Sequence, residues 1–154
     1  MPDTTNQPAK TPWHLWVVGV LALLWNAMGA LDFTMTQTHN EVWLKQFTPE
    51  QLACVYGFPL WAVLGWGIGT WGGLLGSLLF LLRRGCAVNL FAASLVGIVI
   101  TDLYSYGLSD WMKVMKGGTG AVVFSAVIFG IGALLFLYAR AMRKQGVLDR
   151  KSVV

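Results

Sequence analysis

The sequence predicts an all-α fold, an integral membrane bundle of four transmembrane helices. The mean hydropathy is +0.61, and only 12% of the residues are charged, whereas a soluble domain carries about 25%. The apolar residues also gather in four blocks, each close to the ~20 residues that a helix needs to cross the hydrocarbon core of a bilayer. The 154 residues therefore predict one domain that is embedded in lipid.

The first predicted span covers 13–34. The preceding segment 1–12 is polar and contains three prolines, so we expect a disordered cytoplasmic tail. The small residues Ala27 to Gly29 would suit a signal-peptidase site, but Lys10 is the one firm positive charge before the block. The block is also longer and richer in tryptophan than the apolar region of a signal peptide. We interpret it as an uncleaved membrane helix.

The next segment is polar and contains a short predicted helix near 49–56. Thr48 suits the N-cap, Pro49 suits the first helical position, and Gln51 can complete a capping box. Gly57 and Pro59 are expected to end the helix. Aromatic residues before and after the helix place it in the headgroup layer.

Three further spans complete a transmembrane domain over 13–141, at 59–82, 86–106 and 121–139. A basic tail over 142–154 follows, which we expect to contact anionic lipid headgroups. The excess of lysine and arginine on cytoplasmic loops places both termini in the cytoplasm. In this orientation the outer side keeps only three basic residues, Lys45, Lys113 and Lys116.

Two short stretches resemble each other, GSLLFL from Gly76 and GALLFL from Gly132. Asp32 also closes the first span much as Asp102 closes the third. These likenesses fit two like-oriented helical hairpins related by an axis along the membrane normal. Chance similarity between leucine-rich helices is the alternative.

Small residues recur at helical spacing on the second and fourth spans. Such residues let two helix backbones come close together in lipid. The stripe either packs the helices of one bundle or forms a self-association face, so we expect a homo-oligomer or a larger membrane complex. The glycines concerned are Gly65, Gly69, Gly72, Gly76 and Gly130.

A polar ligand-binding site is predicted at the outer ends of the first and third spans. Asp32 and Asp102 lie about one helical turn inside the expected interface, where an acid at a helix C-terminus is slightly unfavourable. Tyr104 and Tyr106 follow Asp102, and Asn26 lies near the middle of the first span, where an amide must be hydrogen-bonded. The alternatives are two solvated helix-end acids and an asparagine that only holds helices together.

Other kinds of site are not expected. The sequence contains no nucleophile–base–orienter set and no phosphate-binding loop, so we predict no enzyme, no cofactor and no metal site. His14 and His39 lie on opposite sides of the membrane, and Cys54 and Cys86 are too far apart for a disulfide. The net charge of +4 forms no basic face, which argues against nucleic-acid binding.

Four stretches resemble a family of small proteobacterial inner-membrane proteins that is often labelled a sugar transporter. They are TPWHLWVVGVLALLWNAMGALDFTMTQT, YGFPLWAVLGWGIGTWGGLLGSLLFLLRR, YSYGLSD and LYARAM, within residues 11–142. The resemblance implies a bacterial inner membrane and a four-helix architecture, and it carries over no binding residues. The spans offer few side chains that could pair with a sugar, and four helices close without leaving a central pore.

The leading functional hypothesis is an oligomer that binds or moves a small solute through a periplasm-facing polar site. The alternative is a non-catalytic accessory or scaffold subunit of a larger membrane complex.

Overall fold

The computed structural model describes residues 11–114 and 118–148. Four long helices are each long and apolar enough to cross a membrane, which confirms the predicted all-α fold. They are α1 (Trp13–Gln37), α4 (Leu60–Leu81), α5 (Ala87–Gly107) and α7 (Gly118–Lys144). Three short helices lie between them: α2 (Glu41–Leu44), α3 (Pro49–Tyr56) and α6 (Trp111–Val114). Residues 1–10 of the predicted tail over 1–12 fall outside the described residues, as do the basic residues Lys10, Lys116, Arg150 and Lys151.

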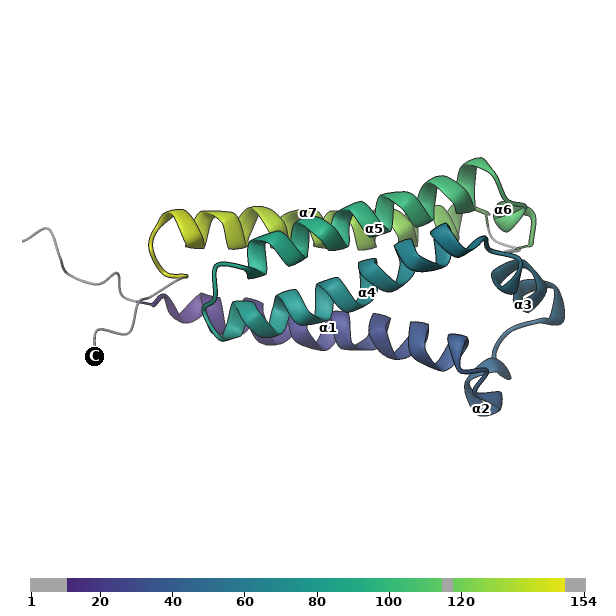
Figure 1. Cartoon of the computed structure of the whole chain (residues 1–154), viewed down its shortest axis with the longest axis horizontal. Coiled ribbons are helices and arrows are strands. Elements are labelled where there is room, and N and C mark those ends of the chain that lie inside the picture. Colours follow the sequence, from purple (N-terminus) through teal and green to yellow (C-terminus); the bar gives the residue numbers. More distant parts are fainter. Residues whose placement is uncertain (1–10, 115–117, 149–154) are drawn as a thin grey trace, which may run out of the picture.

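The four long helices run along the longest axis of the molecule and pack in chain order (Figure 1). α4 packs between α1 and α5, and α5 packs between α4 and α7. The start of α1, the α4–α5 turn and the end of α7 meet at one end, which we call the terminal end. The short helices α2, α3 and α6 mark the other end, which we call the loop end.

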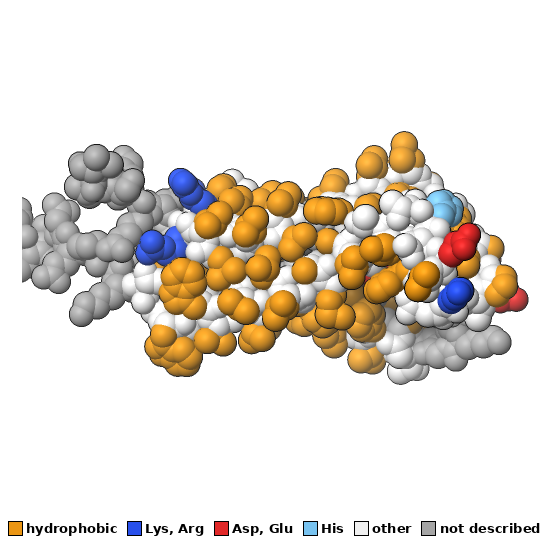
Figure 2. All heavy atoms as spheres, turned by 90° about the horizontal axis from the view of Figure 1, so that it is seen from below, with side chains coloured by type: hydrophobic (Ala, Val, Ile, Leu, Met, Phe, Trp, Pro, Cys, Tyr) orange, Lys and Arg blue, Asp and Glu red, His pale blue; other side chains and the backbone are white. Residues whose placement is uncertain are grey.

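The distribution of side chains on the surface is that of a multi-pass membrane protein. Figure 2 shows hydrophobic side chains over the middle of one face, while the charged side chains gather toward its two ends. Large apolar side chains of the long helices are widely exposed, such as Leu21, Leu64 and Leu134 at 62%, 56% and 68%. Lipid is the solvent in which such a surface is stable.

The predicted capping box begins α3. The Thr48 hydroxyl accepts a hydrogen bond from the Gln51 backbone N–H at 3.3 Å, and Gln51 Oε1 accepts one from the Thr48 N–H at 3.0 Å. Pro49 occupies the first turn, and Gly57 is the C-cap. Because these bonds join residues three positions apart, the sequence alone could predict the helix.

The glycine stripe of α4 is buried, and it faces α5. A Cβ atom on Gly65 would lie 2.7 Å from Ile100 Cγ2, and one on Gly69 would lie 3.3 Å from Ile98 Cγ1. Corresponding positions on Gly72 and Gly76 meet Ser94 at 3.4 Å and Phe91 at 3.0 Å. Of the two predicted uses of this stripe, packing within the bundle is the one observed.

The glycine predicted on the fourth span requires a correction. Within the described part of the chain, Gly130 of α7 has no neighbouring atom within 4 Å of the position that a Cβ would take. Gly132 faces α5 instead, with its Cβ position 3.0 Å from Leu95 Cδ2. Spacing along α7 could not identify the contacting glycine, because the rotation of one helix against another depends on all the side chains in the interface.

The terminal end is closed by a buried cluster and by the chain that follows α7. Gly146, at φ +70°, ends the helix with a Schellman turn, in which the Val147 N–H donates to Met142 O at 3.0 Å. Val147 and Leu148 are then buried against side chains such as Leu15 and Phe80. The predicted tail boundary at residue 142 is therefore too early, because residues 142–148 belong to the folded domain.

Candidate functional site

Asp102 lies at the interface between α5 and α7. It is half-buried, and its carboxyl group is within hydrogen-bonding reach of the Ser125 hydroxyl of α7. Tyr106, one turn further along α5, has its Oη 2.7 Å from Ser125 Oγ and donates to Ala121 O at 3.0 Å. An acid, two hydroxyls and a backbone carbonyl thus form one continuous polar chain across two membrane helices.

A shallow groove runs beside this chain on the outside of the bundle. It has a volume of about 430 Å³, and its lining residues are Val99, Asp102, Leu103, Tyr106 and Gly107. A second hollow of about 500 Å³ adjoins it, where Trp61 and Leu108 meet the same Leu103 and Gly107. Most of both surfaces is apolar, so the Asp102 carboxyl group is the main polar feature that the groove presents.

The second predicted carboxylate is in a different place. Asp32 Oδ1 accepts a hydrogen bond from the Trp43 indole N–H at 3.0 Å, which fastens α2 to the end of α1. α4 separates α1 from α5, and within the described ranges no hydrogen bond or ion pair joins Asp32 to Asp102. The predicted site with two carboxylates is therefore not assembled within one chain.

Asn26 also lies apart from Asp102. Its side-chain amide donates to Ala22 O at 2.9 Å and to Ser77 Oγ at 3.0 Å, which joins α1 to α4. Gly73 leaves the space for this amide, because a Cβ there would collide with Asn26 Oδ1. Asn26 is thus a contact between helices, as the structural alternative proposed.

Tyr104 belongs to an aromatic layer at the loop end. Its ring packs edge-on against Phe58 and Trp61, with centroids 4.8 and 5.3 Å apart. Positions 102 and 104 point to nearly opposite sides of a helix, since each residue turns it by about 100°. Of the five predicted residues, the structure joins only Asp102 and Tyr106.

Ser125 is the member of this group that was missing from the predicted site residues. It lies in the first half of α7, in a stretch of apolar and small residues that carries no local signal for a site. The packing of α7 on α5 brings it beside Asp102 and Tyr106. Only a prediction of helix-to-helix register could have found it.

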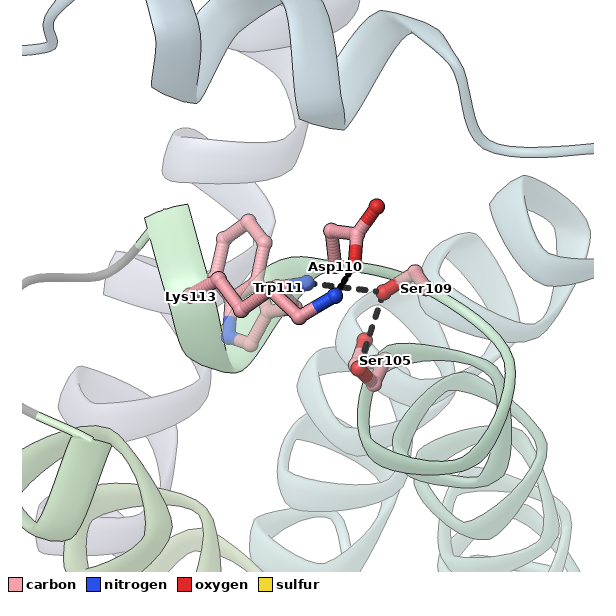
Figure 3. A network of polar contacts seen from close by, with 5 residues as sticks. All are labelled: Ser105, Ser109, Asp110, Trp111 and Lys113. Atoms are coloured by element: carbon pink, nitrogen blue, oxygen red, sulfur yellow. Dashed lines mark hydrogen bonds and ion pairs between the residues drawn. The ribbon is translucent and has the colours of Figure 1, made fainter.

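A separate polar network orders the chain between α5 and α6 (Figure 3). Ser109 Oγ donates to Ser105 O at 2.8 Å and accepts from the Trp111 N–H at 3.2 Å. Lys113 Nζ lies 2.5 Å from Asp110 Oδ1, and this contact raises the pKa of the lysine. Both side chains are exposed, so the ion pair adds little stability.

Neither cysteine takes part in a disulfide. Burial, and then the negative charge of Asp110, raise the pKa of the Cys54 thiol, which keeps it in its unreactive neutral form near pH 7. Cys54 and Cys86 are both free. Over residues 11–114 and 118–148, no group of three histidine, cysteine or acidic residues could hold a metal ion.

Comparison of this chain with protein-family models, with curated proteins and with solved structures gives no match. The family resemblance seen in the sequence therefore stays a prediction, and the functional argument rests on the site itself.

Proposed function

We propose that the protein is an oligomeric transporter or solute-binding protein of the bacterial inner membrane, with its polar site at Asp102. The observation that carries this proposal is a carboxyl group in a membrane-spanning helix, half-buried between α5 and α7 beside an open groove. An ionisable side chain within a membrane-spanning helix is costly, and such residues typically bind a solute, an ion or a proton.

The distribution of basic residues supports an orientation with both termini in the cytoplasm. The terminal end carries Arg83, Arg84, Arg140, Arg143 and Lys144. The loop end has Lys45 and Lys113, with Glu41 and Asp110 nearby in the sequence. By the positive-inside rule, the terminal end is cytoplasmic and the Asp102 groove is near the periplasm. Anionic headgroups of the inner leaflet then surround the basic end.

Assembly into an oligomer would have to use a surface other than the α4 glycines, because α5 already covers them. The exposed side of α7 offers Gly130, whose Cβ position is open, close to Ala126 and Ala133. This open position also favours the second candidate function, an accessory subunit that docks a larger membrane complex through α7.

Native mass spectrometry of protein purified in mild detergent tests the proposal. Wild-type protein and Asp32→Asn are expected to retain the same non-lipid adduct, and Asp102→Asn is expected to lose it while keeping the oligomeric state. Asp32→Asn is the matched control. It removes the same charge from a carboxylate that accepts a hydrogen bond from Trp43 and does not line the groove. Identical spectra for all three proteins would contradict the proposal.

Gly130→Leu tests the accessory role. A co-purifying membrane protein that is lost from Gly130→Leu, together with an Asp102→Asn variant that behaves as wild type, would support docking through α7 rather than solute binding.

A further inference from the structure

The lining of the Asp102 groove restricts what it can bind. Apart from the carboxyl group, the ligand would meet the alkyl side chains of Val99 and Leu103, the ring of Tyr106 and the backbone at Gly107. The hydroxyls of Tyr106 and Ser125 already bond to each other. A hydrophilic solute would lose its hydration here without gaining partners, which costs several kcal/mol per unpaired group. A ligand that fits must be mostly apolar.

The charge of the groove restricts the ligand further. α4, which packs against α5, has no ionisable residue between Leu60 and Leu81. The basic residues of α7 lie at its far end, from Arg140 onward, and Lys113 of α6 is paired with Asp110. Among residues 11–114 and 118–148, no lysine or arginine forms an ion pair with Asp102, and the ion pair observed there is the one between Lys113 and Asp110. A negative charge on Asp102 is therefore stabilised by taking up a proton or a bound cation.

The hydrogen bonds beside the groove depend on whether Asp102 carries a proton. With a proton on Asp102, the carboxyl group can donate to Ser125, Ser125 to Tyr106, and Tyr106 to Ala121 O, so that every group is satisfied. Without that proton, Ser125 donates to the carboxylate, and Tyr106 must choose between Ser125 and Ala121 O. Loss of the proton therefore removes one hydrogen bond from the α5–α7 interface.

We propose that the Asp102 groove binds a lipophilic organic cation, which displaces a proton from the carboxyl group. This inference rests on the proposed function and names its ligand class. One proton leaves as one monovalent cation binds, so charge is conserved and no covalent step is involved. The ligand enters sideways from the bilayer, because the groove is on the outside of the bundle and the most apolar stretch of α7 buries none of its residues.

Tetraphenylphosphonium is the first probe, measured by calorimetry on the full chain in phosphatidylcholine nanodiscs. We expect wild type and Asp32→Asn to bind it with equal affinity, and Asp102→Asn to bind at least about tenfold more weakly, a difference of 1.4 kcal/mol or more. Wild-type affinity should fall as the pH is lowered. Tetraphenylborate has the same shape and the opposite charge, and we expect no Asp102-dependent binding of it.

Two further measurements keep the inference falsifiable. Titration in weakly buffered solution should release about one proton per tetraphenylphosphonium bound. Ser125→Ala keeps the carboxyl group but breaks the hydrogen-bond chain, so it should still bind the cation while the pH at which protons displace it shifts. Equal binding by Asp102→Asn, equal Asp102-dependent binding of tetraphenylborate, no proton release, or an unshifted pH profile in Ser125→Ala would each overturn the inference.

Tetramethylammonium separates this inference from the function on which it rests. It carries the same charge with little apolar surface, so it should bind much more weakly than tetraphenylphosphonium. If tetramethylammonium binds more tightly and in an Asp102-dependent way, the site takes a hydrophilic cation, and only the ligand class is wrong. If neither cation binds while the native adduct still depends on Asp102, the proposed function likewise survives without this inference.

Discussion

The two faces of α5 differ in how they meet their neighbours. Toward α4, backbone approaches backbone: a Cβ on Gly97 would lie 2.5 Å from Gly65 O and 2.6 Å from Gly69 N. Toward α7, the contact near the loop end is made by longer side chains, with Tyr106, Asp102 and Ser125 beside a groove. Gly130 of α7 meets open space, because no atom of the described residues lies within 4 Å of the position that its Cβ would take.

The difference shows how one helix can pack closely against one neighbour and leave a groove beside another. Lipid is as apolar as leucine, so helices in a membrane gain by close packing and by hydrogen bonds rather than by the hydrophobic effect. The glycine-lined α4–α5 interface obtains that close packing and leaves no room for a ligand. The α5–α7 interface packs less closely, which leaves room for the groove beside its carboxyl group.

The largest expected effect comes from disrupting the glycine-lined α4–α5 interface. Gly97→Ala places a methyl group against the α4 backbone, which cannot move aside as a flexible side chain can. We expect a loss of about 3 kcal/mol of stability, measured by thermal unfolding in detergent. The matched control is Gly130→Ala, whose methyl group meets open space and should change stability by about 0.5 kcal/mol or less. Equal melting temperatures for the two variants would contradict the comparison.

The α1–α4 contact tests whether Gly73 of α4 is needed for the same steric reason. Gly73→Ala should cost about 1–2 kcal/mol, because its Cβ collides with the Asn26 amide. In an Asn26→Ala background the cost should largely vanish, which gives a coupling energy of about 1 kcal/mol. Unfolding of the four proteins of this double-mutant cycle provides the measurement, and additive effects would show that Gly73 is not required by Asn26.

One serine in each interface of α5 allows the two interfaces to be compared by the same substitution. In the α4–α5 interface, Ser94 Oγ donates to Gly69 O at 2.5 Å. Ser125 lies in the α5–α7 interface, where it bonds to Tyr106. Replacing either by alanine should cost about 0.6 kcal/mol of stability, the average for a hydrogen bond between membrane helices. Only Ser125→Ala should change the Asp102-dependent adduct in native mass spectrometry. A change of the adduct in Ser94→Ala as well would mean that binding depends on general packing rather than on the α5–α7 interface.

The smallest expected effect lies at the loop end. The charge of Asp110 is the lesser cause that raises the Cys54 pKa, so Asp110→Asn should lower that pKa and increase the thiolate fraction. Labelling of Cys54 by a maleimide at pH 8 should become a few times faster, since the thiolate is the nucleophile. Cys86, at the terminal end, is the internal control. Its rate should not change, and an equal acceleration of both cysteines would point to general loosening instead.

Residues close together in the sequence could be predicted in detail. The start of α3 at Thr48 and Pro49 and its end near Gly57 follow from hydrogen bonds within a single turn. The four spans follow from blocks of apolar residues alone, because the length of a membrane helix is set by the thickness of the bilayer. Of the predicted site residues, Asp102 and Tyr106 are the two that lie together in the structure. They are one turn apart on the same helix, so their proximity needs no tertiary information.

The sequence by itself determined that four lipid-compatible helices form and which stretches they occupy, since backbone hydrogen bonds within a membrane helix are local. It did not determine all of their ends, because α7 runs to Lys144, past the predicted end at residue 139. Only the tertiary structure decided that Gly97 opposes the α4 stripe, that Gly132 rather than Gly130 meets α5, that Ser125 reaches Asp102, and that Asp32 bonds to Trp43 instead. The rotation and depth of each helix against its neighbours result from the packing of many side chains at once. No single stretch of the chain contains that information.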